Sequence, residues 1–591
     1  MNTDTGHPRP PAGETLDPHG AHPRLTALQI ATLVRDGERR VTREGDVLLR
    51  EGEPCKEFIV VLSGTVEIIH DYGGPEERVI ARHGPGRFLG ELGLLEGQVA
   101  FDTAVVAKPG AVLAVPLERQ RDLVARDPVL GDLVLRAYLG RRSLLIGLGA
   151  GFRILGSAYS PDTLRLREFA ARNRLPHRWT DLEKDQEAEE VLHRFGIRPD
   201  ETPVVIWNGR KVLRHPSPAD LASLIGLPHS RLTDLTCDLL VIGTGPAGLA
   251  TAVYGASDGL LTVAVDATAT GGQAGMSSRI ENYLGFPSGI SGGELIERSV
   301  LQARKFGARI TVPAEATGLE QRDGHYTVSF ADGSETATDT VVVAAGVRYR
   351  KLEADGIGGL EGISIHYAAT LHEANLCRDD PVAVVGGGNS AGQAALFLAG
   401  HAPEVYLLVR SGDLGKDMSR YLVDQLERHP KVEILTHTEV RQVHGADVLR
   451  SLNIEDNRTG RRRELAARAL FVFIGTRPHT QWLQDTIALD SQGFVLTGSD
   501  AESVADEKTW LPLGRRPQLL ETTLPGVFAA GDVRSGSVKR VTSAAGEGAT
   551  AVRLVHEHRA RTDIPEDPST PPPRSRSDIR ARIQRARHSG S

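Results

Sequence analysis

Residues 238–248 read Asp-Leu-Leu-Val-Ile-Gly-Thr-Gly-Pro-Ala-Gly, and this stretch decides the fold of the larger part of the chain. An apolar run typical of a buried strand leads directly into the pattern G-x-G-x-x-G, and a helical stretch follows. Gly243 permits a tight turn, Gly245 lets a pyrophosphate approach the backbone, and Gly248 lets helix and strand pack closely. The helix N-terminus offers unpaired N–H groups and the positive end of its dipole to phosphate. The stretch therefore predicts a dinucleotide-binding unit.

The residues that follow strengthen this prediction. A second apolar run, 261–265, ends at Asp266, about 20 residues beyond the glycines. An acid in that place hydrogen-bonds the hydroxyls of a ribose. A lone G-x-G-x-x-G also fits an ordinary tight turn, but strand, glycines, helix, second strand and acid in this order favour a nucleotide site.

A second glycine fingerprint follows the apolar run 382–385. The next strand, 405–409, ends at Arg410 instead of an acid, and a guanidinium there suits a 2′-phosphate. This favours NADPH, while NADH stays open if Arg410 is simply solvated. Two fingerprints predict two dinucleotides, and a flavin with a nicotinamide is the usual pair for hydride transfer. The second site would comprise Gly386, Gly388, Asn389, Ser390, Ala391 and Arg410.

Residues 237–558 resemble the thioredoxin-reductase-like flavoproteins (class II pyridine nucleotide-disulfide oxidoreductases). The resemblance is carried by five further segments: 271–273, 280–287, 342–346, 526–532 and 539–544. It implies an FAD domain split into 237–350 and 476–558, with an NAD(P)H domain, 351–475, inserted between them, and a homodimer. The implied FAD contacts are Gly243, Gly245, Gly248, Asp266, Gly272, Gln273, Asn282, Asp532 and Val541.

One departure from that family bears on the chemistry. Its disulfide reductases carry a CxxC shortly before the second fingerprint, and the matching positions here hold Tyr367 and Thr370. Neither side chain can cycle between dithiol and disulfide. We expect both to face the flavin, with His366 and His372 as possible proton donors or as ordinary surface or core histidines. Cys377, roughly two helical turns on, fits a packed core thiol better than a stand-in.

Two smaller modules precede the flavoprotein body. Residues 151–230 alternate strand and helix and resemble a thioredoxin or glutaredoxin fold, with Thr202-Pro203 as its cis-proline loop. Both cysteines of its thiol motif are replaced, by Ser157 and Ser160. Serine hydroxyls have far too high a pKa to act as thiolates, so we expect a docking or spacer domain.

Residues 25–150 contain short, glycine-punctuated strands and a helical stretch, a pattern typical of a β-roll or barrel. They resemble cyclic-nucleotide-binding domains, in which Gly90 and Glu91 would begin the phosphate cassette. Asp102, or Phe101, stands where that family has a phosphate-binding arginine. An anion facing a phosphate is unfavourable, so we expect the domain to bind another ligand or none.

Bulk properties exclude several classes of protein. The chain has 591 residues and a net charge of −7, and this gives no basic excess for a nucleic-acid partner. Only three cysteines occur, Cys55, Cys237 and Cys377, far apart in sequence, so neither a disulfide scaffold nor a cysteine-rich metal site is expected. No signal peptide or membrane span is evident, which indicates a cytoplasmic protein. Residues 1–24 and 562–591 are expected to be disordered.

The sequence thus predicts a multidomain chain: a β-roll, a small α/β thioredoxin-like domain, and two Rossmann-like domains. The function favoured is transfer of a hydride from NAD(P)H to FAD, and then of electrons to a small-molecule or small redox-protein acceptor, without a CxxC relay. Two alternatives stay open. One is reduction of an external disulfide, such as that of thioredoxin, with Cys377 as a possible participant. The other is a ligand-gated regulatory protein in which the flavoprotein body only senses redox state.

Overall fold

The structure is a computed structural model. It describes residues 14–17, 20–74, 76–90, 99–117, 119, 127–157, 160–185, 187–207, 211–227, 232, 235–277, 279–322, 324–358, 360–361, 363–367, 369, 374, 377–446 and 448–562.

The N-terminal part is a β-roll flanked by two helices. Its sheet runs in the order β1-β6-β3-β4, with β2 beside β6 and β5 beside β3. Phe58 and Phe88 stack in its core with ring centroids 5.1 Å apart. Thr15, in the predicted leader, pairs with Arg82 of β4, so part of that leader is ordered. The elements are α1 (Ala27–Val34), β1 (Glu38–Thr42), β2 (Val47–Leu49), β3 (Glu57–His70), β4 (Arg78–His83), β5 (Phe88–Leu89), β6 (Thr103–Pro116) and α4 (Pro128–Gly147).

A four-stranded sheet with three helices follows, called here the α/β module (152–227). Its strand order is β10-β9-β7-β8, with β8 parallel and β9 antiparallel to β7. The peptide bond Thr202-Pro203 is cis. The elements are β7 (Phe152–Gly156), α5 (Pro161–Arg172), β8 (His177–Asp181), α6 (Glu187–Arg194), β9 (Val204–Trp207), β10 (Lys211–Arg214) and α7 (Pro218–Leu224).

The first fingerprint lies in a seven-stranded sheet of order β13-β12-β11-β16-β15-β14, with β27 beside β16. Val341 of β16 pairs in parallel with Val527 of β27, so segments nearly 200 residues apart share one sheet. Helices α8 and α15 pack against it through small and branched apolar residues. The elements are β11 (Leu235–Ile242), α8 (Pro246–Ser257), β12 (Thr262–Val265), α9 (Gly292–Lys305), β13 (Arg309–Thr311), β14 (Ala316–Arg322), β15 (His325–Phe330), β16 (Glu335–Val343), α13 (Ser499–Glu502), α14 (Glu507–Trp510), β27 (Val527–Ala529) and α15 (Val541–Thr562).

The second fingerprint lies in a separate five-stranded parallel sheet of order β18-β25-β19-β20-β21. The antiparallel pair β17–β26 joins this part of the chain to the preceding sheet. The elements are β17 (Val347–Tyr349), β18 (Ile365–His366), β19 (Val382–Val385), α11 (Asn389–Ala399), β20 (Val405–Leu408), α12 (Arg420–Arg428), β21 (Val432–Leu435), β22 (Thr438–His444), β23 (Ser451–Asp456), β24 (Arg462–Ala466), β25 (Ala469–Val472) and β26 (Thr476–Pro478).

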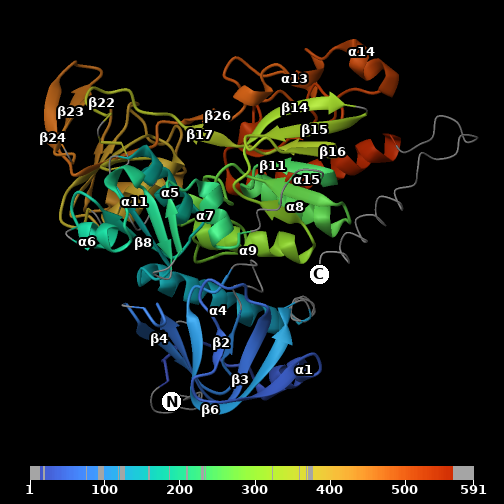
Figure 1. The fold of residues 1–591 in the computed structure, drawn as a ribbon. Helices are drawn as coiled ribbons and strands as arrows, with labels where there is room; N and C mark the ends of the chain where they lie inside the picture. The colour runs from blue at the N-terminus through green and yellow to red at the C-terminus, as the bar shows by residue number, and fades with distance from the viewer. Residues whose placement is uncertain are drawn as a thin grey trace, which may run out of the picture.

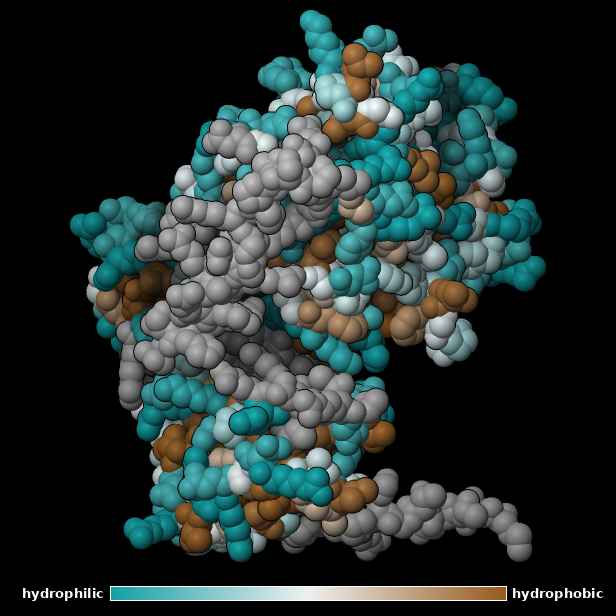
Figure 2. Space-filling view, turned by 90° about the vertical axis from the view of Figure 1, so that its right-hand side faces the viewer, coloured by the Kyte–Doolittle hydropathy of each residue, from teal (hydrophilic) through white to brown (hydrophobic). Residues whose placement is uncertain are grey.

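Helix α4 lies between the roll and the rest of the molecule (Figure 1). The α/β module and α9 both lie on the far side of this helix from the roll. In Figure 2 the described surface is mostly hydrophilic, with apolar residues scattered among polar ones, as on most folded proteins. Among the residues that the structure describes, no helix combines the length and the hydropathy needed to cross a bilayer.

Candidate functional site

The glycine turn between β11 and α8 has the geometry that a bound phosphate needs. Gly243 has φ of 103°, and a Cβ there would lie 2.2 Å from the carbonyl oxygen of Ala344. A Cβ on Gly248 would lie 1.8 Å from the carbonyl oxygen of Gly243. Neither contact is possible for a side chain, so both positions require glycine. The turn therefore brings the first N–H groups of α8 to the carboxyl edge of the parallel strands, where such sheets bind nucleotides.

Asp266 follows β12 at the same edge and is held by four donors. One carboxylate oxygen accepts from the backbone N (2.9 Å) and Oγ1 (3.1 Å) of Thr244. The other accepts from the backbone N of Thr268 (3.1 Å) and of Ala269 (3.3 Å). The acid thus joins the glycine turn to the loop after β12. Sequence reasoning singled out Asp266 and did not consider Thr244, the residue between the first two glycines.

An uncapped cradle lies beside this acid. Gly245 is the N-cap of α8 and makes no side-chain capping bond. Gly272, with φ of 53°, approaches it so closely that a Cβ on Gly272 would lie 3.2 Å from the Cα of Gly245. Gln273 donates its side-chain amide to the carbonyl oxygen of Val347 (2.7 Å). The two glycine segments and the N-terminus of α8 leave room and donors for the pyrophosphate of a dinucleotide. Asp266 is placed to accept from the ribose of its adenosine.

The last predicted flavin residues come together at the start of α15. Asp532 lies three residues beyond the end of β27, and burial raises the pKa of its carboxyl, with Lys539 opposing this effect and Glu547 adding to it. Val541 begins the 22-residue helix α15 and packs near Tyr283, in the loop that carries the exposed Asn282. The structure therefore gathers the loop 280–287, Asp532 and the N-terminus of a long helix, which is where an electron-rich ring edge would be stabilised.

The second fingerprint repeats the geometry of the first. Gly386 has φ of 146°, and a Cβ there would lie 2.4 Å from the carbonyl oxygen of Phe473. Gly388 is the uncapped N-cap of α11, and Ala391 is fully buried. Asn389 does not point into this cradle, because its Oδ1 accepts from the backbone N of Ser419 (2.7 Å). Ser390 is exposed on the first turn of α11, and Arg410 is exposed at the end of β20.

Of the two positions that replace the CxxC, the structure describes only Tyr367. Its hydroxyl donates to a carboxylate oxygen of Glu361 (2.9 Å) and accepts from the backbone N of Leu352 (3.3 Å). Burial, with Glu361 adding to it, raises the pKa of Tyr367 to about 12. The hydroxyl is thus engaged in holding the linker after β17. Thr370 and His372 lie outside the described residues, and His366 packs against Phe471, with ring centroids 5.3 Å apart.

All three cysteines are buried, and no disulfide joins any two of them. Cys377 is 2% exposed and belongs to the apolar core around β19 and α11. Cys237 is 3% exposed, and burial raises the pKa of its thiol to about 12. A thiol in such surroundings stays protonated and is a poor nucleophile. No pair of thiols is therefore available to relay electrons.

In the roll, the residues at the cassette-arginine position serve other contacts. Asp102 accepts from Nδ1 of His70 (3.2 Å), and Phe101 stacks on Trp207 of the α/β module with centroids 5.6 Å apart. Gly90 has a positive φ, and a Cβ there would lie 2.3 Å from the carbonyl oxygen of Glu57, so this position requires glycine. Glu91 lies outside the described residues. Neither Phe101 nor Asp102 presents a cation to a phosphate.

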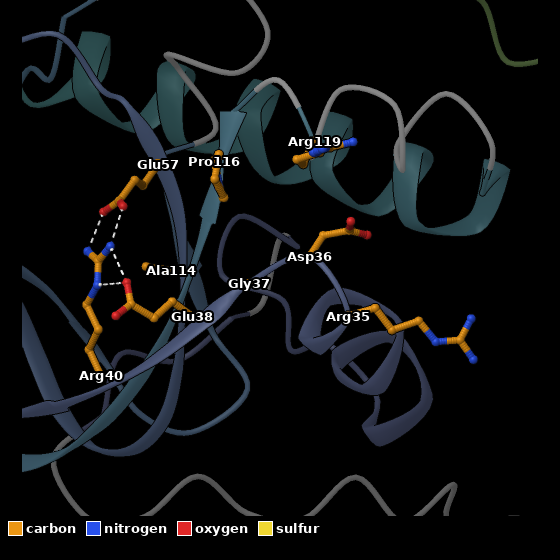
Figure 3. A pocket seen from close by; sticks show the side chains of 9 residues that line it. All are labelled: Arg35, Asp36, Gly37, Glu38, Arg40, Glu57, Ala114, Pro116 and Arg119. Atoms are coloured by element: carbon orange, nitrogen blue, oxygen red, sulfur yellow. Dashed lines mark hydrogen bonds and ion pairs between the residues drawn. The ribbon is translucent and has the colours of Figure 1, made fainter.

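A shallow depression on the roll's surface is lined by charged side chains, and those at its centre are paired with one another (Figure 3). Arg40 donates to both carboxylate oxygens of Glu57 (2.7 and 2.6 Å) and to Glu38 (3.0 Å). Arg35 and Arg119 lie apart from that cluster. Because its central arginine is already paired with two carboxylates, the depression is a weak candidate for an anion site.

Comparison with known proteins places the two ends of the chain in different families. The pyridine nucleotide-disulphide oxidoreductase model matches residues 237–548, and the cyclic nucleotide-binding domain model matches residues 39–127. The chain is 31% identical over 337 residues to a thioredoxin reductase of Streptomyces clavuligerus, covering 57% of this chain and 98% of the relative. It is 32% identical over 314 residues to that of Treponema pallidum, covering 53% and 94%. The crystal structure of T. acidophilum thioredoxin reductase shares the fold, with a TM-score of 0.50 at 24% identity, covering 55% of this chain and all of that one.

Proposed function

We propose a function from the premise that this chain belongs to the pyridine nucleotide-disulphide oxidoreductase family, with a thioredoxin-reductase-like body behind a cyclic nucleotide-binding domain. It is an oxidoreductase that oxidises NAD(P)H through FAD and delivers the electrons to an acceptor directly, without a protein disulfide. The observation that carries this proposal is the number and the burial of the cysteines. A body similar to thioredoxin reductases has two cysteines, Cys237 and Cys377, both buried and not joined by a disulfide.

The first fingerprint would hold the FAD. Gly243, Gly245 and Gly272 leave room for the pyrophosphate, and Asp266 would accept from the ribose. Asp532 and the N-terminus of α15 would face the ribityl chain and the ring. When bound, FAD supplies the hydride acceptor and the electron donor of the reaction. The protein's part is to bind it, to orient it and to exclude water.

The second fingerprint would hold the nicotinamide cofactor, with Gly386 and Gly388 beside its pyrophosphate. Arg410 stands exposed where an acid would otherwise meet the ribose. A guanidinium there attracts a 2′-phosphate and an acid repels it, so NADPH is the expected donor. Asn389 would act indirectly. Its side-chain oxygen accepts from the backbone N of Ser419 and so fixes the backbone before α12.

The N-terminal part would support this activity without redox chemistry of its own. The order β7-α5-β8-α6-β9-β10-α7 and the cis-proline before β9 support a thioredoxin fold for the α/β module. Ser160 is the N-cap of α5 and accepts from the backbone N of Thr163 (3.3 Å). The serine at this position of the expected thiol motif therefore stabilises the start of α5. We expect a docking domain within a cytoplasmic homodimer.

The test is NADPH consumption by the purified protein with four kinds of acceptor: thioredoxin with a chromogenic disulfide, a quinone, ferredoxin and oxygen. Turnover with a non-disulfide acceptor, and none with disulfide, is expected. The variant Cys377→Ser should keep that turnover within about 2-fold, because a small, isosteric change in the core leaves the flavin path intact. Cys237→Ser, a buried thiol in the other domain, is the matched control.

Fast turnover with the disulfide alone, lost in Cys377→Ser but kept in Cys237→Ser, would contradict the direct-acceptor proposal. It would instead make Cys377 the nucleophile of a disulfide reductase.

A further inference from the structure

The α/β module touches the loop that carries the ribose acid. Asn173, the C-cap of α5, donates its side-chain amide to the carbonyl oxygen of Thr268 (3.1 Å) and to that of Phe169 (2.9 Å). The backbone N of Thr268 in turn donates to Asp266 (3.1 Å). Two hydrogen bonds thus connect a residue of the thiol-free module with the acid of the first fingerprint.

Helix α4 holds Asn173 from the other side. Arg142, 3% exposed, donates its Nη2 to the carbonyl oxygen of Asn173 (2.6 Å) and its Nε to that of Arg174 (2.8 Å). It also donates to the hydroxyl of Tyr138 on the same helix. A buried guanidinium that satisfies two carbonyls just beyond a helix fixes the end of that helix. The position of Asn173 is therefore set by the roll's last helix as well as by α5.

The C-terminal end of α5 also contacts α9, through a residue with left-handed backbone geometry. Arg174 has φ of +51° and closes a Schellman motif, with its N bonded to the carbonyl oxygen of Ala171 and the N of Leu175 bonded to that of Ala170. Glycine is the usual residue there. Here the arginine side chain pairs with Glu297 of α9 (3.1 Å), a carboxylate 7% exposed. Retention of a side chain in left-handed backbone indicates that this docking contact matters.

We propose that Asn173 is a positioning residue for Asp266, so that the α/β module forms the outer wall of the FAD site. The inference rests on the proposed binding of FAD at the first fingerprint. Asp266 is aligned from inside by Thr244 and from outside by Asn173 through Thr268. The α/β module, which contains no cysteine, would thus have a structural role in cofactor binding. This predicts that FAD affinity depends on a residue absent from the flavoprotein body.

The experiment titrates FAD into the full-length apoprotein and follows flavin fluorescence. Asn173→Ala and Asn173→Gly both remove the amide donor and keep the backbone carbonyl that accepts from Arg142. Each should raise the FAD dissociation constant about 5- to 10-fold, the effect of one lost hydrogen bond. ADP used as a competitor should weaken in the same ratio, because the effect lies at the adenosine end. Arg165→Ala, on the exposed face of the same helix, is the control and should bind as wild type.

A merely structural role would lower the melting temperature of the apoprotein, whereas positioning leaves that temperature and the visible spectrum of the saturated flavin unchanged. Wild-type affinity in both Asn173 variants would overturn the inference while leaving the proposed function intact. Failure of the wild-type protein itself to bind FAD would overturn the proposed function, and this inference with it.

Discussion

Glu51 is an acid in a place that disfavours its charge. It lies where the roll meets the α/β module, 8% exposed, and accepts from the indole N–H of Trp207 (3.1 Å). Burial raises the pKa of Glu51 to about 7, Asp102 adds to the rise, and His70 opposes it. Burial lowers the pKa of His70, but its bond to Asp102 raises that pKa on balance. The contact between the two domains therefore contains a carboxyl that titrates near neutral pH.

The stability of this contact should fall as pH rises. Between the ordinary carboxyl pKa of about 4.5 and the folded value of about 7, the folded state holds the Glu51 proton and the unfolded state does not. The free energy of unfolding then falls with pH across that window, by about 3 kcal/mol for this group, and is flat above it. Thermal melts and Trp207 emission between pH 5 and 8 measure the effect.

Glu51→Gln is the control for this pH dependence, since its amide oxygen can still accept from Trp207 and its charge never changes. The variant should show a shallower fall in melting temperature over the same range, because it loses the titration of Glu51 and also the Glu51 charge that helps to raise the pKa of His70. Identical slopes would show that Glu51 does not titrate as described.

At the scale of elements, the C-terminal end of α5 has a strained backbone and also contacts α9. A non-glycine residue in left-handed backbone costs about 1 kcal/mol, and Arg174 offsets this by pairing with the buried Glu297. Arg174→Ala would lose the ion pair and keep the strain, while Arg174→Gly would lose the pair and relieve the strain. We expect Arg174→Ala to be the less stable variant by about 1 kcal/mol.

Urea unfolding followed by circular dichroism compares these two variants, with Arg174→Lys, which keeps the charge, as the reference. If Arg174→Gly were the less stable of the pair, the left-handed geometry would not be strained and the docking argument from Arg174 would lose its basis.

Elements whose sequence signals are local were open to prediction, and contacts between distant elements were not. The strand–glycine–helix order at 238–248 and 382–391 predicted the two turns, because the glycine pattern is short and local, although the backbone that excludes a Cβ at Gly243 and Gly386 lies far along the chain, at Ala344 and Phe473. That Tyr367 faces the flavin stays a prediction; its hydroxyl bonds Glu361 and Leu352, and the spacing to a missing CxxC contains no information on such partners. Asn173 was missed because its partner, Thr268, is 95 residues away.

At the scale of the whole molecule, the roll and the α/β module share a core. Phe101 of the roll, 1% exposed, stacks on Trp207 and lies in one apolar cluster with Phe152 and Phe169. The backbone N of Val99 also donates to the carbonyl oxygen of Ile225 (3.3 Å). Sequence signals predicted two separate domains here, and side chains that pack across a boundary leave no periodic pattern in the sequence. The two N-terminal domains should therefore behave as one cooperative unit.

Phe101→Ala tests that unit. Truncating a fully buried aromatic costs about 3–5 kcal/mol, and because this ring belongs to the core of the neighbouring module, the loss should destabilise both domains together. Calorimetry and limited proteolysis should show the roll and residues 152–227 becoming labile in step, while Val41→Ala, 84% exposed on the same roll, changes little. Separate unfolding of the roll alone would contradict the shared core. Joint unfolding would mean that Phe101, at or beside the position where we expected the phosphate-binding arginine of cyclic nucleotide-binding domains, joins the roll to the α/β module through its stacking on Trp207.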